Sequence, residues 1–121
     1  MAAPKDEFAA YCVELLAGLG AARAKRMFGG HGLYVDELIV GIAASGELYL
    51  KADAQTQPQF EAAGCHPFVY GASTKAVAMS YWSAPDEAIE SPAAMLPWAR
   101  LAQAAALRAR ALKPRGRKAS G

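Results

Sequence analysis

The fold is decided by the stretch Arg23-Ala-Lys-Arg-Met-Phe-Gly-Gly-His-Gly-Leu-Tyr-Val-Asp36. It reads as a basic β-strand that runs through paired glycines into a second strand. Gly29 and Gly30 indicate a backbone that bends there or approaches another segment closely, where a side chain would not fit. The stretch therefore predicts a hairpin with strands at 24–28 and 32–36, and nothing in it is catalytic in kind.

The first half of the chain predicts one helix and two more strands besides this hairpin. Apolar residues at steps of three and four predict an amphipathic helix over 5–19. Runs with a period of two predict strands at 38–43 and 47–51, joined by tight turns. In the last of these strands, Leu48 and Leu50 alternate with polar or aromatic neighbours. We therefore expect one face of the sheet to be buried and the other to be wet.

The second half predicts a short helix, a hairpin and a long helix. Thr56-Gln-Pro-Gln59 is a capping-box pattern that opens a helix ending at Gly64. The β-prone runs 67–70 and 76–82 flank a turn-rich segment and predict the hairpin. Ser91-Pro92 then predicts the cap and first position of an alanine-rich helix that reaches about residue 112. Pro97 predicts either a kink in this helix or a separate first turn.

This order of elements defines the expected fold class. Strands and helices do not alternate, which argues against a parallel doubly wound sheet. We expect an α+β fold, in which an antiparallel sheet of about five to six strands is flanked by helices. With 121 residues, the chain is expected to form one domain over 1–112, followed by a basic disordered tail over 113–121.

Composition narrows the class of protein further. With 54% apolar and 20% charged residues, and no apolar run near the roughly 18 residues of a membrane span, we expect a water-soluble protein with no membrane partner. The amino terminus lacks the features of a secretory signal, so we expect a cytoplasmic location.

Cys12 and Cys65 are far apart and are expected to be reduced, buried thiols. Two Cys and two His do not suffice for a typical zinc site, so we expect no metal.

Charge is segregated along the chain. The net charge of +2 combines seven basic and eleven acidic residues through Leu107 with six basic and no acidic residues beyond it. The tail either binds phosphate backbones without reading sequence, or simply solubilises the chain and complements the helix dipole. Three further cations share the first strand, where they form either a solvated edge or a recognition patch. The candidate nucleic-acid contacts are therefore Arg23, Lys25, Arg26, Lys113, Arg115, Arg117 and Lys118.

Other candidate motifs favour structural roles. Gly29-Gly-His-Gly32 runs into a strand and not into a helix, so a turn is favoured over a phosphate-binding loop. His31 has no nucleophile or carboxylate motif around it. Tyr81, Trp82 and Trp98 form either a ligand surface or packing, with packing favoured. We expect no catalytic residue and no cofactor.

Five motifs in order resemble the N-terminal domain family of the competence regulator TfoX (Sxy): Arg26-Met-Phe-Gly-Gly-His-Gly-Leu-Tyr34, Leu48-Tyr-Leu-Lys51, Phe60-Glu-Ala-Ala-Gly-Cys-His-Pro-Phe68, Met79-Ser-Tyr-Trp82 and Trp98-Ala-Arg-Leu-Ala102. The resemblance implies a fold similar to the type III secretion-chaperone group. It also implies a bacterial regulator of natural transformation that acts with the cyclic-AMP receptor protein. The motif residues, mostly structural, are Met27, Phe28, Gly29, Gly30, Leu48, Tyr49, Lys51, Gly64, Phe68, Tyr81 and Trp98.

We therefore expect a stand-alone N-terminal domain, without the C-terminal domain of the full-length regulator, that is not an enzyme. It is expected to act in transcription regulation through contacts with another protein, of unknown identity, or with a second copy of itself as a homodimer. The alternative is a nucleic-acid-binding module that uses Arg23, Lys25, Arg26 and the tail, with weak, non-specific DNA binding. An enzyme ranks third.

Overall fold

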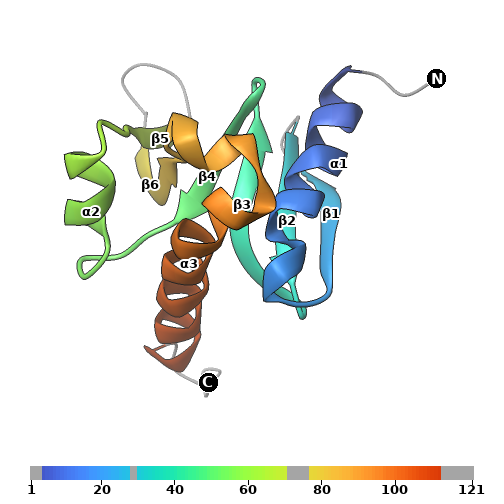
Figure 1. Ribbon diagram of the computed structural model, residues 1–121. Coiled ribbons are helices and arrows are strands. Elements are labelled where there is room, and N and C mark those ends of the chain that lie inside the picture. The colour runs from blue at the N-terminus through green and yellow to red at the C-terminus, as the bar shows by residue number, and fades with distance from the viewer. Residues whose placement is uncertain (1–3, 28–29, 71–76, 113–121) are drawn as a thin grey trace.

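The computed structural model describes residues 4–27, 30–70 and 77–112 (Figure 1). Its elements are, in order, α1 (Pro4–Leu16), the 3-10 helix η1 (Ala17–Leu19), β1 (Ala22–Met27), β2 (Gly30–Val35), β3 (Leu38–Ala44), β4 (Glu47–Lys51), α2 (Gln57–Ala62), β5 (Pro67–Tyr70), β6 (Val77–Ser83), the 3-10 helix η3 (Asp86–Glu90) and α3 (Pro92–Leu112).

The six strands form one sheet in the order β1-β2-β3-β4-β6-β5, and all neighbours are antiparallel. The first four strands form a meander, and the hairpin of β5 and β6 joins it through β6. The expected α+β class with flanking helices is confirmed. The pairing of β4 with β6 is the one neighbour relationship that the order of elements does not dictate, since α2 and β5 lie between these strands in sequence.

Helices α1 and α3 cover one face of the sheet, which we call the inner face (Figure 1). Leu48 and Leu50 point into this core, as expected. On α3 the buried stripe is mostly alanine, so the helix axis can lie close to the strands. The largest fully buried side chains are Phe60, Leu15, Leu16, Leu33, Leu48, Leu50, Met95, Val35, Val40 and Cys12.

The helix ends differ in places from those that the sequence predicts. The first helix is α-helical only to Leu16, and its last turn tightens to a 3-10 helix. Ser91 caps α3 as expected, because its Oγ accepts the backbone N–H of Ala94 at 3.1 Å. Helix α3 continues through Pro97, which excludes the separate first turn, and the alternative of a kink at Pro97 stays a prediction. The 3-10 helix η3 was not predicted, because its five residues lack any amphipathic period.

Gly30 confirms the close backbone approach that the paired glycines predict. A Cβ at this position would lie 2.4 Å from the carbonyl oxygen of Ala43 on β3. No side chain fits at that distance, so β2 and β3 can pair here only because Gly30 has none. Phe28 and Gly29 lie outside the described residues.

The expectation that the second face of the sheet is simply wet is wrong. On this outer face, opposite α1 and α3, Ile42, Tyr49 and Tyr81 are each less than a tenth exposed. Ala44 and Phe68 pack against them. Large aromatic side chains shield one another here, although no described helix packs on them.

Candidate functional site

The outer face of the sheet is the candidate functional site, and strand register explains how it is assembled. Lys25, Gly32, Ile42, Tyr49 and Ser83 are successive cross-strand partners on β1, β2, β3, β4 and β6. Residues in one cross-strand row share a face, so this row runs across most of the outer face. Its members come from positions 25 to 83 of the chain.

Two cation–aromatic pairs lie on the same face. The Arg23 guanidinium sits over the Tyr34 ring at 5.1 Å from its centroid, and these residues are cross-strand partners. The Lys51 ammonium lies 5.0 Å from the centroid of the Tyr81 ring, again between cross-strand partners. The Tyr34 ring is half-buried, whereas the Tyr81 ring is only 7% exposed, so a ligand on this face would meet the Tyr34 ring and the two cations and not the Tyr81 ring.

Arg23 is also held by a carboxylate. It donates to Glu37 of the β2–β3 turn through Nη2 at 2.7 Å and through Nε at 3.2 Å. These hydrogen bonds, and then the charge of Arg23, hold the pKa of Glu37 below its usual range. The Glu37 carboxylate therefore holds the guanidinium in one orientation through a bidentate contact.

Tyr49 is the most constrained ring of the outer face. Its hydroxyl donates to Glu47 Oε1 at 2.8 Å, and its ring lies 4.7 Å from that of Phe68. Burial, followed by the contact with Glu47, raises the pKa of Tyr49 to about 12. Burial and then the nearby Tyr34 also raise the pKa of Tyr81. The Tyr49 and Tyr81 phenols are therefore neutral hydrogen-bonding groups near neutral pH.

The motif residues of the sequence divide into two groups. Tyr49, Lys51, Phe68 and Tyr81 converge on the outer face, whereas Leu48 and Trp98 belong to the inner core or its border. The Trp98 ring packs against Phe60 at 5.3 Å. The remaining motif residues have backbone roles or lie outside the described residues: Gly30 allows close strand approach, Gly64 follows α2 with φ of 82°, Met27 ends β1, and Phe28 and Gly29 are not described.

The candidate nucleic-acid contacts are only partly placed. Arg23, Lys25 and Arg26 are exposed on β1, which is a terminal strand of the sheet. Lys113, Arg115, Arg117 and Lys118 lie outside the described residues. The described part of the chain therefore presents a basic strand, and the expected cooperation between this strand and the tail stays a prediction.

A second cluster brings together residue types that sequence reasoning did not connect. The His66 ring lies between Ser83 and Glu47, with Nδ1 3.4 Å from Ser83 Oγ and Nε2 3.5 Å from Glu47 Oε1. With Cys65 and Asp86 they line a pocket of about 300 Å³. No local sequence pattern indicates this cluster, because its members come from β4, the loop before β5, β6 and η3.

This cluster lacks an activated nucleophile. Ser83 is only 5% exposed, and its Oγ accepts the backbone N–H of His66 at 3.0 Å. Burial is the largest cause that raises the pKa of the Cys65 thiol, with further contributions from Asp86 and Glu87. A thiol that keeps its proton is a poor nucleophile. Cys65 was expected to be buried, but it is only half-buried. Cys12 lies in the core as expected, and burial raises its pKa to about 12. Both thiols are free.

The described residues lack two features that would define other classes of site. Among residues 4–27, 30–70 and 77–112, no three side chains of His, Cys, Asp and Glu are grouped so that they could hold a metal ion. None of the helices in this part of the chain has the length and apolar character needed to cross a membrane.

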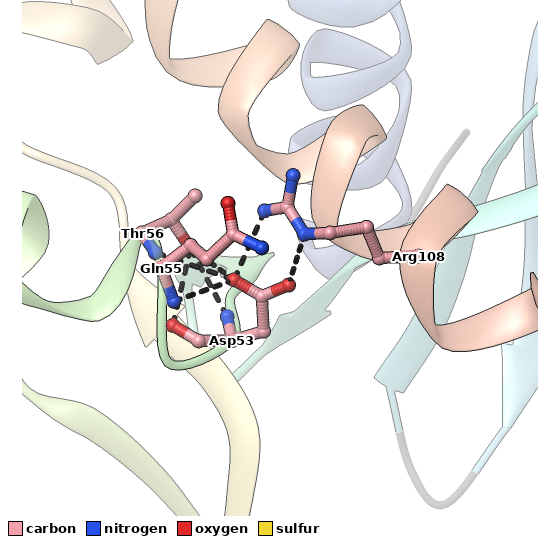
Figure 2. A network of polar contacts seen from close by, with 4 residues as sticks. All are labelled: Asp53, Gln55, Thr56 and Arg108. Carbon is pink, nitrogen blue, oxygen red and sulfur yellow. Dashed lines mark hydrogen bonds and ion pairs between the residues drawn. The ribbon is translucent and has the colours of Figure 1, made fainter. Parts of the chain in front are cut away.

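Figure 2 shows the polar contacts that anchor α3 to the loop before α2. Arg108 binds Asp53, and Asp53 Oδ1 accepts the backbone N–H groups of Gln55 and Thr56 at 3.0 and 3.2 Å. The expected capping box at Thr56 is wrong, because the Thr56 side chain accepts no backbone N–H of α2. Its Oγ1 accepts the backbone N–H of Asp53 instead. This contact network positions elements of the fold and does not present a reactive group.

Fold and site together define a small α+β domain whose outer sheet face carries aromatic and charged side chains. The chain belongs to the TfoX N-terminal domain family, whose model matches residues 14–106. It is similar to DNA transformation protein TfoX1 of Aliivibrio fischeri (strain ATCC 700601 / ES114), with 27% identity over 78 residues. The match covers 64% of this chain and 37% of that relative.

Proposed function

We propose that this chain is a non-enzymatic regulatory protein of the TfoX type that acts by binding another protein through the outer face of its sheet. Membership of the TfoX N-terminal domain family supports the regulatory role. The name of the relative, DNA transformation protein TfoX1, supports a link to DNA transformation. We further propose that the chain acts in transcription regulation in the bacterial cytoplasm.

The observation that carries the proposal is the grouping of rings and cations on one sheet face. Arg23 over Tyr34 and Lys51 over Tyr81 place charge beside apolar area, while Glu47 holds Tyr49 in one orientation. Tyr and Arg are over-represented among the residues that contribute most to protein–protein binding. Side chains that are already held in place lose little conformational freedom when a partner binds.

A catalytic role is less well supported by the same residues. The described nucleophiles beside His66 are a nearly buried Ser83 hydroxyl and the protonated Cys65 thiol. Acid–base or nucleophilic catalysis requires a reachable group with a pKa matched to its task. The proposal therefore assigns the Ser83–His66–Glu47 contacts to the docking of the β5–β6 hairpin onto β4.

A nucleic-acid interface is the second candidate, and the three cations of β1 favour it. Arg23 already binds Glu37, however, and the chain through Leu107 carries more acidic than basic residues. DNA binding would therefore depend mainly on the cations beyond Leu107 and would carry no base specificity.

The proposal is tested by quantitative capture from an extract of the source cell with the immobilised chain. Wild type is compared with Tyr34→Ala, which removes a half-buried ring of the outer face, and with Arg100→Ala, an exposed position on α3 that serves as the control. Circular dichroism checks that both variants fold. We expect at least one protein to be retained by wild type and by Arg100→Ala, and to fall at least tenfold with Tyr34→Ala.

The same variants test self-association. Sedimentation that shows a species of twice 12.7 kDa for wild type, and loss of that species in Tyr34→Ala, would identify the partner as a second copy. If no retained protein and no dimer depend on Tyr34, the outer face is not an interaction site and the proposal fails.

A further inference from the structure

We propose that β1 is an open docking edge that accepts an acidic, extended segment of a partner protein as a seventh strand of the sheet. The inference rests on the proposed function in one respect, that the partner is a protein. It goes further by assigning a place in the fold and the chemistry of the segment that binds there.

The two ends of the sheet differ in regularity. β1 and β5 are its terminal strands. β5 has only four residues, begins with Pro67 and has a register shift between Pro67 and Val69. β1 pairs with β2 through six consecutive partners, from Ala22↔Val35 to Met27↔Gly30, without a shift. Figure 1 shows β1 as the outermost ribbon at its end of the sheet.

This difference determines which edge can accept another strand. Proline has no N–H to donate, and a bulge interrupts the ladder of hydrogen bonds, so both features protect an edge. A regular six-residue edge presents alternate N–H and C=O groups at the spacing that an added strand requires. β1 is therefore the suitable edge, although its cations oppose pairing with a neutral or basic strand and so restrict what can pair there.

Charge decides which strand can pair there. β1 has the sequence Ala-Arg-Ala-Lys-Arg-Met over 22–27, with three cations and no acid. Arg23 and Lys25 lie on the outer face, and Arg26 follows on the opposite side. Two β1 strands paired with each other would bring like charges together, which is destabilising. A segment that carries carboxylates would instead place opposite charges beside these cations, which stabilises the pairing. The occupant is therefore an acidic segment and not a second β1 strand.

The register specifies the pattern of that segment. Adjacent cations at positions 25 and 26 point to opposite faces, so they are matched by two adjacent acidic residues. Ala24 faces the inner side and packs against the core, so the residue opposite it can be apolar. Glu37 already shows how a carboxylate binds on the outer face, because it accepts two hydrogen bonds from Arg23. A fitting segment therefore contains two consecutive acidic residues followed or preceded by β-branched ones.

The probe for the test is the synthetic peptide Val-Thr-Glu-Glu-Val-Thr-Val with a fluorescent label, observed by anisotropy with the full chain. Its matched controls are Val-Thr-Lys-Lys-Val-Thr-Val and an acidic peptide methylated on alternate backbone nitrogens. We expect the acidic peptide to bind at least tenfold more tightly than either control, a difference of about 1.4 kcal/mol or more. Amide NMR signals of residues 22–27 should shift on binding.

Charge exchange makes the test decisive. The double variant Lys25→Glu with Arg26→Glu should lose the acidic peptide at least tenfold and gain the lysine peptide, whereas Arg100→Glu should bind as wild type does. Binding that survives backbone methylation or the double variant would overturn the proposal, as would absence of binding at millimolar peptide. Preferential binding of single-stranded oligonucleotides at Lys25 and Arg26 would overturn it too.

The two proposals fail separately. If the peptide does not bind while a cellular partner is still lost in Tyr34→Ala, the docking edge is wrong and the interaction face stands. If the peptide binds as expected but no partner depends on Tyr34, the edge stands and the outer face is not the contact surface.

Discussion

Arg108 of α3 binds Asp53 from 55 residues further along the chain, with Nε donating to Oδ2 at 2.6 Å and Nη2 donating to Oδ1 at 3.0 Å. Asp53 also caps the backbone N–H groups of the turn that leads into α2. One carboxylate thus joins the long helix to the segment between β4 and α2 (Figure 2).

Replacing Asp53 should therefore destabilise two elements at once. Asp53→Ala removes both the ion pair and the cap, and loss of a cap typically costs about 0.5–2 kcal/mol. Asp53→Asn keeps an acceptor for the backbone and should be less destabilising.

The stabilisation by Asp53 should also depend on pH. Arg108, chiefly through its hydrogen bond, lowers the pKa of Asp53. The stability that this ion pair contributes is therefore complete above an unfolded pKa of about 3.9 and is lost as pH falls through the folded value. Urea unfolding should show wild type and Asp53→Asn converging below about pH 4; a constant difference down to pH 2 would contradict this account.

Gly30→Ala should destabilise the sheet by about 1–3 kcal/mol, because the new Cβ would overlap the Ala43 carbonyl oxygen and force β2 away from β3. Gly18→Ala is the control, since its Cβ would meet only Leu96 Cδ1, at 3.4 Å. Thermal unfolding of both variants measures the difference. Equal melting temperatures for the two variants would show that the strands can separate at Gly30 without loss.

Phe60→Ala should lower the free energy of unfolding by about 3–5 kcal/mol, because the ring is fully buried. The change should also alter the emission of Trp98, whose ring is 5.3 Å away. Phe68→Ala, at a half-buried position of the outer face, should cost less. If the Phe68 variant were the less stable of the two, the outer face would contribute more to folding than the inner core.

Tyr49 should titrate at about 12, well above an ordinary tyrosine at about 10. The difference in phenolate absorbance between wild type and Tyr49→Phe measures this value. Glu47→Gln should lower the pKa but keep it above 10, because burial is the largest cause. Since the folded state holds this proton more tightly, the stability it contributes is present below about pH 10 and is lost as pH rises through about 12. A wild-type value near 10 would mean that the Tyr49 hydroxyl is solvated.

Deleting residues 113–121 should remove most DNA binding while leaving the melting temperature nearly unchanged. If about four of the six cations beyond Leu107 reach phosphates, the logarithm of affinity should fall against that of salt concentration with a slope of roughly −3 to −4. Anisotropy of a labelled duplex over a salt series provides the measurement. Sequence-selective binding that survives the deletion would place recognition on residues 1–112 and favour the nucleic-acid interface.

The strands, the turns and the main helices follow from the sequence itself. Period-two alternation places Leu48 and Leu50 on one face whatever the neighbouring strands are, because successive side chains of a strand point in opposite directions. The paired glycines at positions 29 and 30 indicate a bend or a close approach, but the atom that Gly30 approaches, the carbonyl oxygen of Ala43, belongs to β3 and follows from strand pairing. The family motifs could be recognised from the sequence because each is a contiguous stretch of residues.

Tertiary structure alone decided what the outer face contains. Tyr49 and Ser83 become neighbours only because β6 inserts beside β4, and the sequence carries no local sign of a pairing between strands separated by a helix and another strand. The capping pattern at Thr56 gave a wrong prediction for a similar reason. Asp53, and not Thr56, accepts the backbone N–H groups before α2, and Arg108 orients Asp53 from a distant helix. Local propensity is a property of the chain over a few residues, whereas these contacts depend on packing energies that arise only once the strands have assembled into the sheet.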